Sequence, residues 1–347
     1  MSRMKQILII VSFIVIIANS AVASNWREDA ETIDISGGED HTLVVTRNKW
    51  PWACGPNTWY QLGIGDTTES QKTLVRVHGG AMNTPRLQDI NDIEAGWKHS
   101  LALDVNSFVW SWGDNEQGQL GVGEGKPHSN VPVRVLRGEQ APPDPNNPDP
   151  NLARIIAISA GRSGQHSLAI DANGYAYGWG YNKYGQCGND ESNNRKLTPV
   201  RVHRGDQPED LNDPNNWLKH IIDICAGADQ SIAVEKDDPT DPNFNGCVYT
   251  WGTNWWGDED YEEGWIDPGY GLLGTGSNVA IEDTPVKVHG VNDVNFLEHI
   301  VAIAAGWDHC MALEKDDPWD PNLNGRAFTW GNNGSGWGGG DFVKDFA

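Results

Sequence analysis

Positively charged side chains are scarce in this sequence. Its 347 residues include 25 Lys and Arg against 48 Asp and Glu, which gives a net charge of −23. Nucleic-acid affinity comes largely from cationic side chains that replace the counterions of phosphates. The composition therefore argues against nucleic acid as a partner, and it leaves basic protein surfaces and divalent metal ions as candidates.

Cysteines are few, and their spacing follows no known pattern. They form no CxxC pair and no metal-ligand spacing, so neither a disulfide framework nor a cysteine-based metal site is predicted. Most of them take places where a repeat described below has Trp, Leu, Ala or Ser. We interpret them as small buried hydrophobic residues, although a single disulfide bridge stays open. The five are Cys54, Cys187, Cys225, Cys247 and Cys310.

Long apolar runs are missing except near the N-terminus. The run there, Ile7 to Ala18, has twelve residues, fewer than the roughly 20 that cross a bilayer. Arg3 and Lys5 precede it and small residues follow it, which is the order of a secretory signal peptide. We predict a signal peptide at 1–23, cleaved after Ala23, and a secreted, periplasmic or cell-surface protein with no membrane segment after cleavage. Cleavage would remove two positive charges and no negative one, so the net charge would change from −23 to −25.

Recognisable catalytic motifs are also missing. The chain has no GxSxG, HExxH or P-loop motif and no isolated Cys–His pairing. Carboxylates are plentiful, but nothing singles out two of them as a glycosidase-like pair. We therefore assign no catalytic residue and predict a non-enzymatic protein.

One module recurs five times after a linker at 24–32. The approximate copies are 33–79, 93–138, 155–205, 221–290 and 300–347. The second copy reads "AGWKHSLALDVNSFVWSWGDNEQGQLG" and closes on "PVRV". Each copy has a Gly pair or Ala-Gly before a polar residue, then a Trp-Gly-x-Asn turn (CGPN in the first copy), and all but the last close on a PVRV-like strand.

Each copy predicts four short strands, because four-to-seven-residue runs of β-formers alternate with Gly, Asn, Asp and Pro. Large residues such as Leu101 and Leu103 face one way and small ones the other, so both faces of each sheet are expected to be covered. One unit cannot bury both faces alone, and radial stacking hides its edges. The prediction is an all-β β-propeller with about five four-stranded repeats, the last incomplete. Three possibilities stay open: "DFVKDF" supplies the missing strand, one blade is assembled from both ends, or the chain is part of a larger ring of the seven-bladed type.

The combination of AGxxHS, WGxNxxGQLG and PVxV resembles the repeat of the regulator of chromosome condensation family over about residues 33 to 340. The resemblance implies a β-propeller, commonly with seven blades. In the nuclear member the propeller promotes nucleotide exchange on a small GTPase and contacts chromatin, roles that an exported acidic protein would not share. A secreted bacterial propeller of this family inhibits β-lactamases through aromatic-rich loops, so we expect a secreted bacterial-type member.

Two repeated positions are interpreted as structural. Glutamine replaces histidine in the fourth copy of one position, and this change keeps hydrogen bonding but loses titration. A link between blades is therefore favoured over catalysis for His41, His99, His166, Gln230 and His309. The second position is the tryptophan of the Trp-Gly turn: Trp112, Trp179, Trp251 and Trp330, with Cys54 in the first copy.

Copies four and five each carry an inserted loop that resembles the start of a calcium-binding loop, D-x-[DN]-x-[DN]-G. The glutamate expected at the twelfth position is missing, and a long hairpin tip closed by Asx-turns is the alternative. We predict no cofactor, with calcium as a second possibility. Its ligands would be Asp237, Asp238, Asp241, Asn243 and Asn245 in one loop and Asp316, Asp317, Asp320, Asn322 and Asn324 in the other.

The fourth copy also contains "NWWGDEDYEEGWIDPGYG" (254–271). Six positions separate Trp112 from Gly118 in copy two, whereas twenty separate Trp251 from Gly271. Aromatic and acidic residues on a rigid scaffold are typical of a binding loop, although the rings could also pack locally or stack on sugars. The predicted partner-binding residues are Trp255, Trp256, Asp258, Glu259, Asp260, Tyr261, Glu262, Glu263, Trp265 and Tyr270.

These patterns predict an exported acidic propeller that binds an unknown protein or surface polymer, and the acidic charge favours one with a basic surface. Two other functions stay open. One is a propeller enzyme or lectin-like protein that acts on polysaccharide, and the other is a calcium-stiffened structural envelope protein.

Overall fold

The computed structural model describes residues 31–140, 149–192, 195–208, 216–237, 245–254, 271–277, 279–290, 295–316, 323 and 325–331, and the backbone of 344–346. The predicted signal peptide lies outside these residues. None of the helical structure in the described part is long or apolar enough to span a membrane. The described helical element is the 3-10 turn η1 (Gly80–Met82).

The strands of the described chain form five four-stranded antiparallel sheets, each from four consecutive strands. We call the sheets blades 1 to 5. Blade 1 contains β1 (Thr32–Gly37), β2 (Thr42–Thr46), β3 (Pro51–Pro56) and β4 (Ser70–Arg76). Blade 2 contains β5 (Ile90–Ala95), β6 (His99–Asp104), β7 (Val109–Asp114) and β8 (His128–Arg134). Blade 3 contains β9 (Ile155–Ala160), β10 (His166–Asp171), β11 (Ala176–Gly180) and β12 (Lys196–Arg201).

Blade 4 contains β13 (Ile221–Ala226), β14 (Gln230–Glu235), β15 (Val248–Thr253) and β16 (Ile281–Lys287), and blade 5 contains β17 (Ile300–Ala305), β18 (His309–Glu314), β19 (Ala327–Gly331) and β20 (Lys344–Phe346). The predicted all-β fold with five four-stranded units is confirmed. The last blade takes its short fourth strand from "DFVKDF", because β20 pairs with β19. No sheet in the described chain combines strands from both ends of the sequence.

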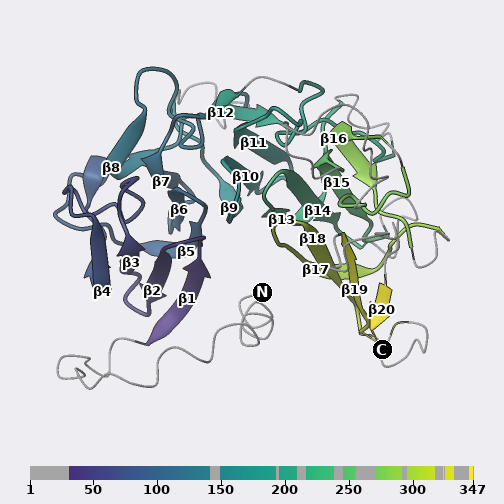
Figure 1. The fold of residues 1–347 in the computed structure, drawn as a ribbon, viewed down its shortest axis with the longest axis horizontal. Helices are drawn as coiled ribbons and strands as arrows, with labels where there is room; N and C mark the ends of the chain where they lie inside the picture. The colour runs from purple at the N-terminus through teal and green to yellow at the C-terminus, as the bar shows by residue number, and fades with distance from the viewer. Residues whose placement is uncertain are drawn as a thin grey trace, which may run out of the picture.

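The blades follow one another around an arc, with the first strand of each blade on the inner side (Figure 1). Successive strands are antiparallel, so one face of the arc carries the turns between first and second strands and the loops between third and fourth strands. We call this the loop face. The opposite face carries the hairpins between second and third strands and the blade-to-blade connections, and we call it the connector face.

The core lies between the blades. All six residues of β6 are buried, and they alternate between two interfaces. Leu101 and Leu103 pack against Trp179 of blade 3, whereas Ala102 lies beside Trp112 in the cluster shared with blade 1. Large residues therefore face the next blade, and small residues leave room for the tryptophans that face the preceding one.

The Trp-Gly pair differs from its predicted role as a turn. In blade 2 it lies within β7, where the pairing with β8 shifts between Ser111 and Gly113. Gly113 has φ 105°, and a Cβ there would lie 2.5 Å from the carbonyl oxygen of Lys98. The glycine therefore forms a β-bulge, and the chain leaves the strand two residues later at Asn115.

The two ends of the arc are less covered than its middle. In β18 the residues at alternate positions, His309 and Met311, are exposed, although the equivalent residues of β6 are buried. In β1, Ile33 and Ile35 are exposed as well. Figure 1 shows these two end blades apart from each other.

Candidate protein-binding face

A buried asparagine fixes the base of every described loop between third and fourth strands. In blade 2, Asn115 Oδ1 accepts a hydrogen bond from the Leu120 amide (2.9 Å), and its Nδ2 donates to the Lys126 carbonyl (2.6 Å). In blade 4, Asn254 makes the same two bonds, with the Leu273 amide (3.0 Å) and the Ser277 carbonyl (2.8 Å). The same arrangement is made by Asn57 and Asn182. The long insertion of blade 4 therefore starts from an unchanged base.

All ten residues predicted to bind a partner fall between Asn254 and Gly271 and lie outside the described residues. They are Trp255, Trp256, Asp258, Glu259, Asp260, Tyr261, Glu262, Glu263, Trp265 and Tyr270. The two ends of the insertion are described and lie on the loop face. Just after it, the Leu272 carbonyl lies 3.9 Å from Cys310 Sγ of blade 5. The insertion is thus attached beside the boundary between blades 4 and 5.

The loop face also carries aromatic residues that the sequence reasoning missed. Trp59 exposes 39% of its surface and Trp307 exposes 54%, and Trp97 is half-buried. Lys98 joins two of them, because its Nζ lies 4.2 Å from the ring centre of Trp59 and 4.1 Å from that of Trp97. Both Trp97 and Trp307 directly follow the Ala-Gly motif, and aligning the copies at that position would have found them.

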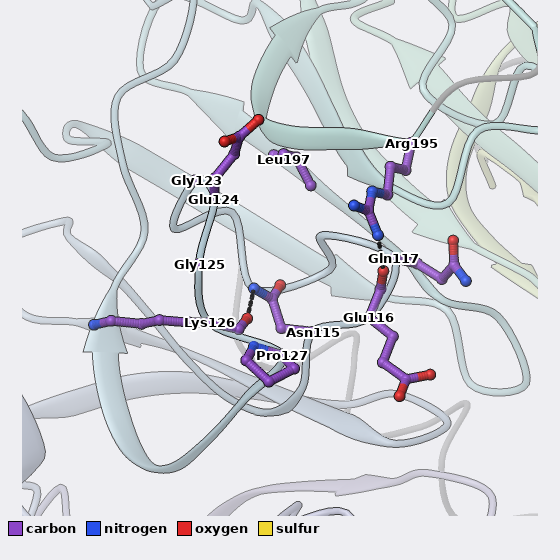
Figure 2. Close-up of a pocket in the computed structure, with 10 residues that line it drawn as sticks. All are labelled: Asn115, Glu116, Gln117, Gly123, Glu124, Gly125, Lys126, Pro127, Arg195 and Leu197. Carbon is purple, nitrogen blue, oxygen red and sulfur yellow. Dashed lines mark hydrogen bonds between the residues drawn. The ribbon is translucent and has the colours of Figure 1, made fainter.

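A hollow of about 740 Å³ opens between the blade 2 loop and blade 3. Residues 115–117 and 123–127 line one side, and Arg195 and Leu197 line the other (Figure 2). Arg195 Nη1 donates to the Glu116 carbonyl oxygen (2.5 Å). Figure 2 shows the charged ends of Glu116, Glu124 and Lys126 pointing in different directions. The hollow therefore has no convergent charged groups of the kind that catalysis or metal binding needs.

The repeated histidines join neighbouring blades. His41 Nε2 lies 2.8 Å from Ser100 Oγ, and the same bond joins His99 to Ser167 (2.9 Å) and His166 to Ser231 (3.0 Å). Ser100 donates its own proton to the Gln61 carbonyl (2.8 Å), so it accepts from His41, whose proton is on Nε2. Burial lowers the pKa of each of these three histidines to about 3.

The repeated tryptophans share the same acceptors. Trp112 Nε1 donates to the Gln61 carbonyl (2.8 Å), as does Ser100. Trp179 and Trp251 donate in the same way to the carbonyls of Gln119 and Gln186. The glutamine of the GQLG motif thus provides one carbonyl to two buried donors of the next blade.

The boundary between blades 4 and 5 is built differently. Gln230 replaces the histidine and Cys310 replaces the serine, and Gln230 Nε2 donates to the carbonyls of Gly306 (3.2 Å) and Trp307 (3.1 Å). Trp330 Nε1 is buried and has no hydrogen-bond partner among the described residues. His309 of blade 5 is half exposed, and its Nδ1 lies 3.4 Å from Asp308 Oδ1. At this boundary the Gln230 side chain therefore bonds to the backbone of the turn at Trp307, whereas the histidines at the other boundaries bond to a serine hydroxyl.

The proposed calcium ligands are described only in part. Asp237, Asn245 and Asp316 lie within the described residues, on the connector face, and the others lie outside them: Asp238, Asp241, Asn243, Asp317, Asp320, Asn322 and Asn324. Asp237 Oδ2 lies 3.4 Å from His299 Nδ1 and 3.8 Å from Lys315 Nζ. The described residues contain no group of three or more His, Cys, Asp or Glu placed to hold a metal ion.

We expect an excess of EDTA to leave the Tm of the protein unchanged. The reason is that the Lys315 ammonium lies beside Asp237 and repels a second cation at that carboxylate. Thermal melts with and without chelator test this expectation, and Lys315→Met serves as the variant in which the repulsion is removed. A Tm that falls with EDTA and returns with calcium, but not with magnesium, would contradict it.

Comparison with known proteins places this architecture in a family. An RCC1-like domain model matches residues 17–343. The human probable E3 ubiquitin-protein ligase HERC6 is 25% identical over 88% of this chain, which spans only 24% of that relative.

Two solved structures share the fold. Human WBSCR16 superposes with a TM-score of 0.65 at 20% identity and covers 92% of this chain and 68% of its own. Yeast RCC1 (Prp20), solved with bound Kap60, gives a TM-score of 0.56 at 20% identity, with 87% and 56% covered. These named relatives are eukaryotic. The matched family model extends over most of the sequence, and the chain belongs to the RCC1-like domain family.

Proposed function

We propose that this protein is a non-enzymatic binding module that recognises another protein through its loop face. The observation that carries this proposal is that the loop face presents tryptophans on turns of rigid sheets. Trp307 lies beside the attachment point of the acidic and aromatic insertion, and Trp59 and Trp97 lie at the boundary of blades 1 and 2. Exposed aromatic residues on a fixed scaffold are typical of protein-binding surfaces. RCC1-like propellers commonly mediate protein interactions, and the yeast relative was solved with Kap60 bound.

We further propose that the protein is exported and that its partner has a basic surface. The predicted signal peptide at 1–23 supports export, in keeping with a secreted bacterial-type member of the family. The net charge of −23 favours a basic partner because complementary charge steers association. The protein is proposed to need no cofactor, and calcium binding by the inserted loops of blades 4 and 5 is the alternative that the chelator experiment above tests.

Deleting residues 255–268 is expected to abolish capture of the partner while leaving the Tm within a few degrees of wild type. The deletion shortens the loop to about the length of its counterparts and keeps the Asn254 base. The matched control deletes residues 142–147, an insertion on the connector face. Both variants and the wild type would be immobilised and exposed to the extracellular fraction, with retained proteins measured by quantitative mass spectrometry. The same retained proteins on all three would contradict recognition through the loop face.

A further inference from the structure

The fourth strand is the outer edge of each blade, and in blades 2, 3 and 4 the connection from the preceding blade covers it. Each of these connections places a glycine against the carbonyl of a proline on the fourth strand, so closely that a Cβ on the glycine would overlap that carbonyl. The three pairs are Gly80 and Pro132, Gly138 and Pro199, and Gly205 and Pro285. All three prolines are buried. Proline also removes an amide that could pair with a further strand, which protects a sheet edge.

An acidic residue completes the cover in blades 3 and 4. The Glu139 amide donates to the Pro199 carbonyl (2.9 Å), and Glu139 Oε2 accepts from the Arg201 amide (2.9 Å). Asp206 makes the same two bonds to the fourth strand of blade 4, at 2.9 and 3.2 Å. One acidic residue in an extended segment therefore satisfies a carbonyl and an amide that lie two residues apart on the edge.

Blade 1 differs in its proline and in its cover. Its fourth strand closes on "LVRV", so Leu74 takes the place of the proline, and it is half-buried where the prolines are buried. By their equivalence to Pro199 and Arg201, Leu74 and Arg76 turn their main-chain groups toward the outer edge. Among the described residues, none takes the place of Glu139 at this edge. Figure 1 shows β4 on the outer side of blade 1.

The side chains around this edge are positively charged. Strand β4 carries Lys72 and Arg76 and no carboxylate, and Arg86 Nη1 donates to the Arg76 carbonyl (3.4 Å). The Arg76 guanidinium itself lies within the blade, 4.3 Å from the ring centre of Trp50, so its main-chain amide and not its side chain is the open group. In a chain with a net charge of −23, such an edge favours a negatively charged occupant.

We propose that the outer edge of β4 binds an extended acidic segment of a partner protein. This second position lies away from the loop face and goes beyond the function proposed above. The Leu74 carbonyl accepts from an amide of the segment, and the Arg76 amide donates to its carboxylate, as Arg201 donates to Glu139. The Leu74 amide donates to a carbonyl of the segment, a bond that proline prevents in the other blades. Pairing of an extended peptide with a free sheet edge is a recurrent mode of recognition.

The probe is a labelled hexapeptide with capped ends, VLRGEQ, which copies the connection at 135–140. Its binding is measured by fluorescence anisotropy. The peptide VLRGQQ lacks only the carboxylate and is expected to bind about 10-fold more weakly, because hydrogen bonds to a charged group are the stronger ones. Equal affinities for the two peptides would overturn the proposal.

Two substitutions at one position isolate the Leu74 amide. Leu74→Pro introduces the residue found in blades 2 to 4 and is expected to weaken VLRGEQ binding about 5-fold, through the loss of one hydrogen bond. Leu74→Ala keeps the amide and is the matched control, with affinity within about 2-fold of wild type. Equal affinities of the two variants would show that the edge amide is not used and would overturn the proposed pairing. The 255–268 deletion should bind the peptide as wild type does, so this test and that of the loop face fail separately.

Hydrogen exchange over residues 70–77 identifies the occupant. Saturating VLRGEQ is expected to slow exchange of the Leu74 and Arg76 amides at least about 10-fold in the wild type, and VLRGQQ at the same concentration should slow it less. Equal protection in the protein without peptide would overturn the proposal. If that protection rises with protein concentration, a second copy occupies the edge. If it is independent of concentration, the chain itself covers the edge.

Discussion

Trp251→Ala is expected to lower the free energy of unfolding by about 3–5 kcal/mol. The side chain is fully buried in the cluster between blades 3 and 4, where it packs with Leu168 and Ile170. Its Nε1 also donates to the Gln186 carbonyl (2.8 Å). The substitution therefore opens a cavity and removes a buried hydrogen bond, and both effects destabilise the same interface.

A matched pair separates the hydrogen bond from the packing. Trp251→Phe and Trp330→Phe make the same change in shape at equivalent positions, but Trp330 Nε1 has no hydrogen-bond partner to lose within the part of the chain that the structure describes. Trp251→Phe is expected to cost about 1 kcal/mol more than Trp330→Phe. Urea denaturation of the two variants and the wild type measures the difference. Equal costs would show that the shared glutamine carbonyl contributes nothing measurable to stability.

The repeat made the fold predictable. Five copies of one strand pattern predict five sheets, and the alternation of Leu101 and Ala102 predicts that both faces of each sheet are covered. The role of the Trp-Gly pair was predicted wrongly, as a turn, because a turn and a β-bulge both favour glycine at positive φ. Only the shift in pairing at Gly113 distinguishes them.

The contacts that build the site were not predictable in the same way. His41 meets Ser100, 59 residues away, and Lys98 meets Trp59 across the boundary of two blades. Such pairs require knowing which residue of one copy faces which residue of the next. The joint change to Gln230 and Cys310 is visible in the sequence, but its result, a fixed turn at Trp307, is not.

The blades with inserted hairpins differ from the others in how the carboxylate at the end of the second strand is bonded, and the sequence reasoning missed this difference. In blade 2 the second strand ends on Asp104, whose Oδ1 accepts from the amides of Asn106 (2.8 Å) and Phe108 (3.0 Å) in a tight turn. Blade 4, with its longer hairpin, ends the same strand on Glu235, which accepts from the Tyr249 hydroxyl (3.0 Å). Asp104 reaches the third strand as well, because its Oδ2 accepts from Trp110 Nε1 (2.9 Å). The difference lies in the other oxygen: Glu235 Oε1 accepts from the Cys247 amide (3.3 Å), just before the third strand, and not from a tight turn.

Acid is expected to destabilise the protein steeply between pH 6.5 and 5. The folded pKa of His41, His99 and His166 is lowered to about 3 by burial, whereas an unfolded histidine titrates near 6.5. Below pH 6.5 the unfolded chain therefore binds protons that the folded chain excludes. The stability that these neutral histidines provide is complete above pH 6.5 and is lost as pH falls toward 3. At pH 5 each histidine is expected to cost about 2 kcal/mol, and the three together about 6 kcal/mol.

Blade 4 suggests the variant that tests this expectation. His99→Gln combined with Ser167→Cys copies the Gln230–Cys310 pair and removes one of the three titrating groups. Buried carboxyls act in the opposite direction, because burial raises the pKa of Asp229 and Glu235 and so favours their neutral form in the folded protein. These carboxyls are the same in both proteins, so their contribution cancels in the difference. Urea denaturation at pH 7.5, 6 and 5 measures the free energy of unfolding of the wild type and the double variant. The histidine contribution to its loss should be about one third smaller in the double variant, a difference of about 2 kcal/mol at pH 5. Parallel stability curves for the two proteins would mean that the histidine at this interface is protonated when folded, and its bond to Ser167 would then need a different account.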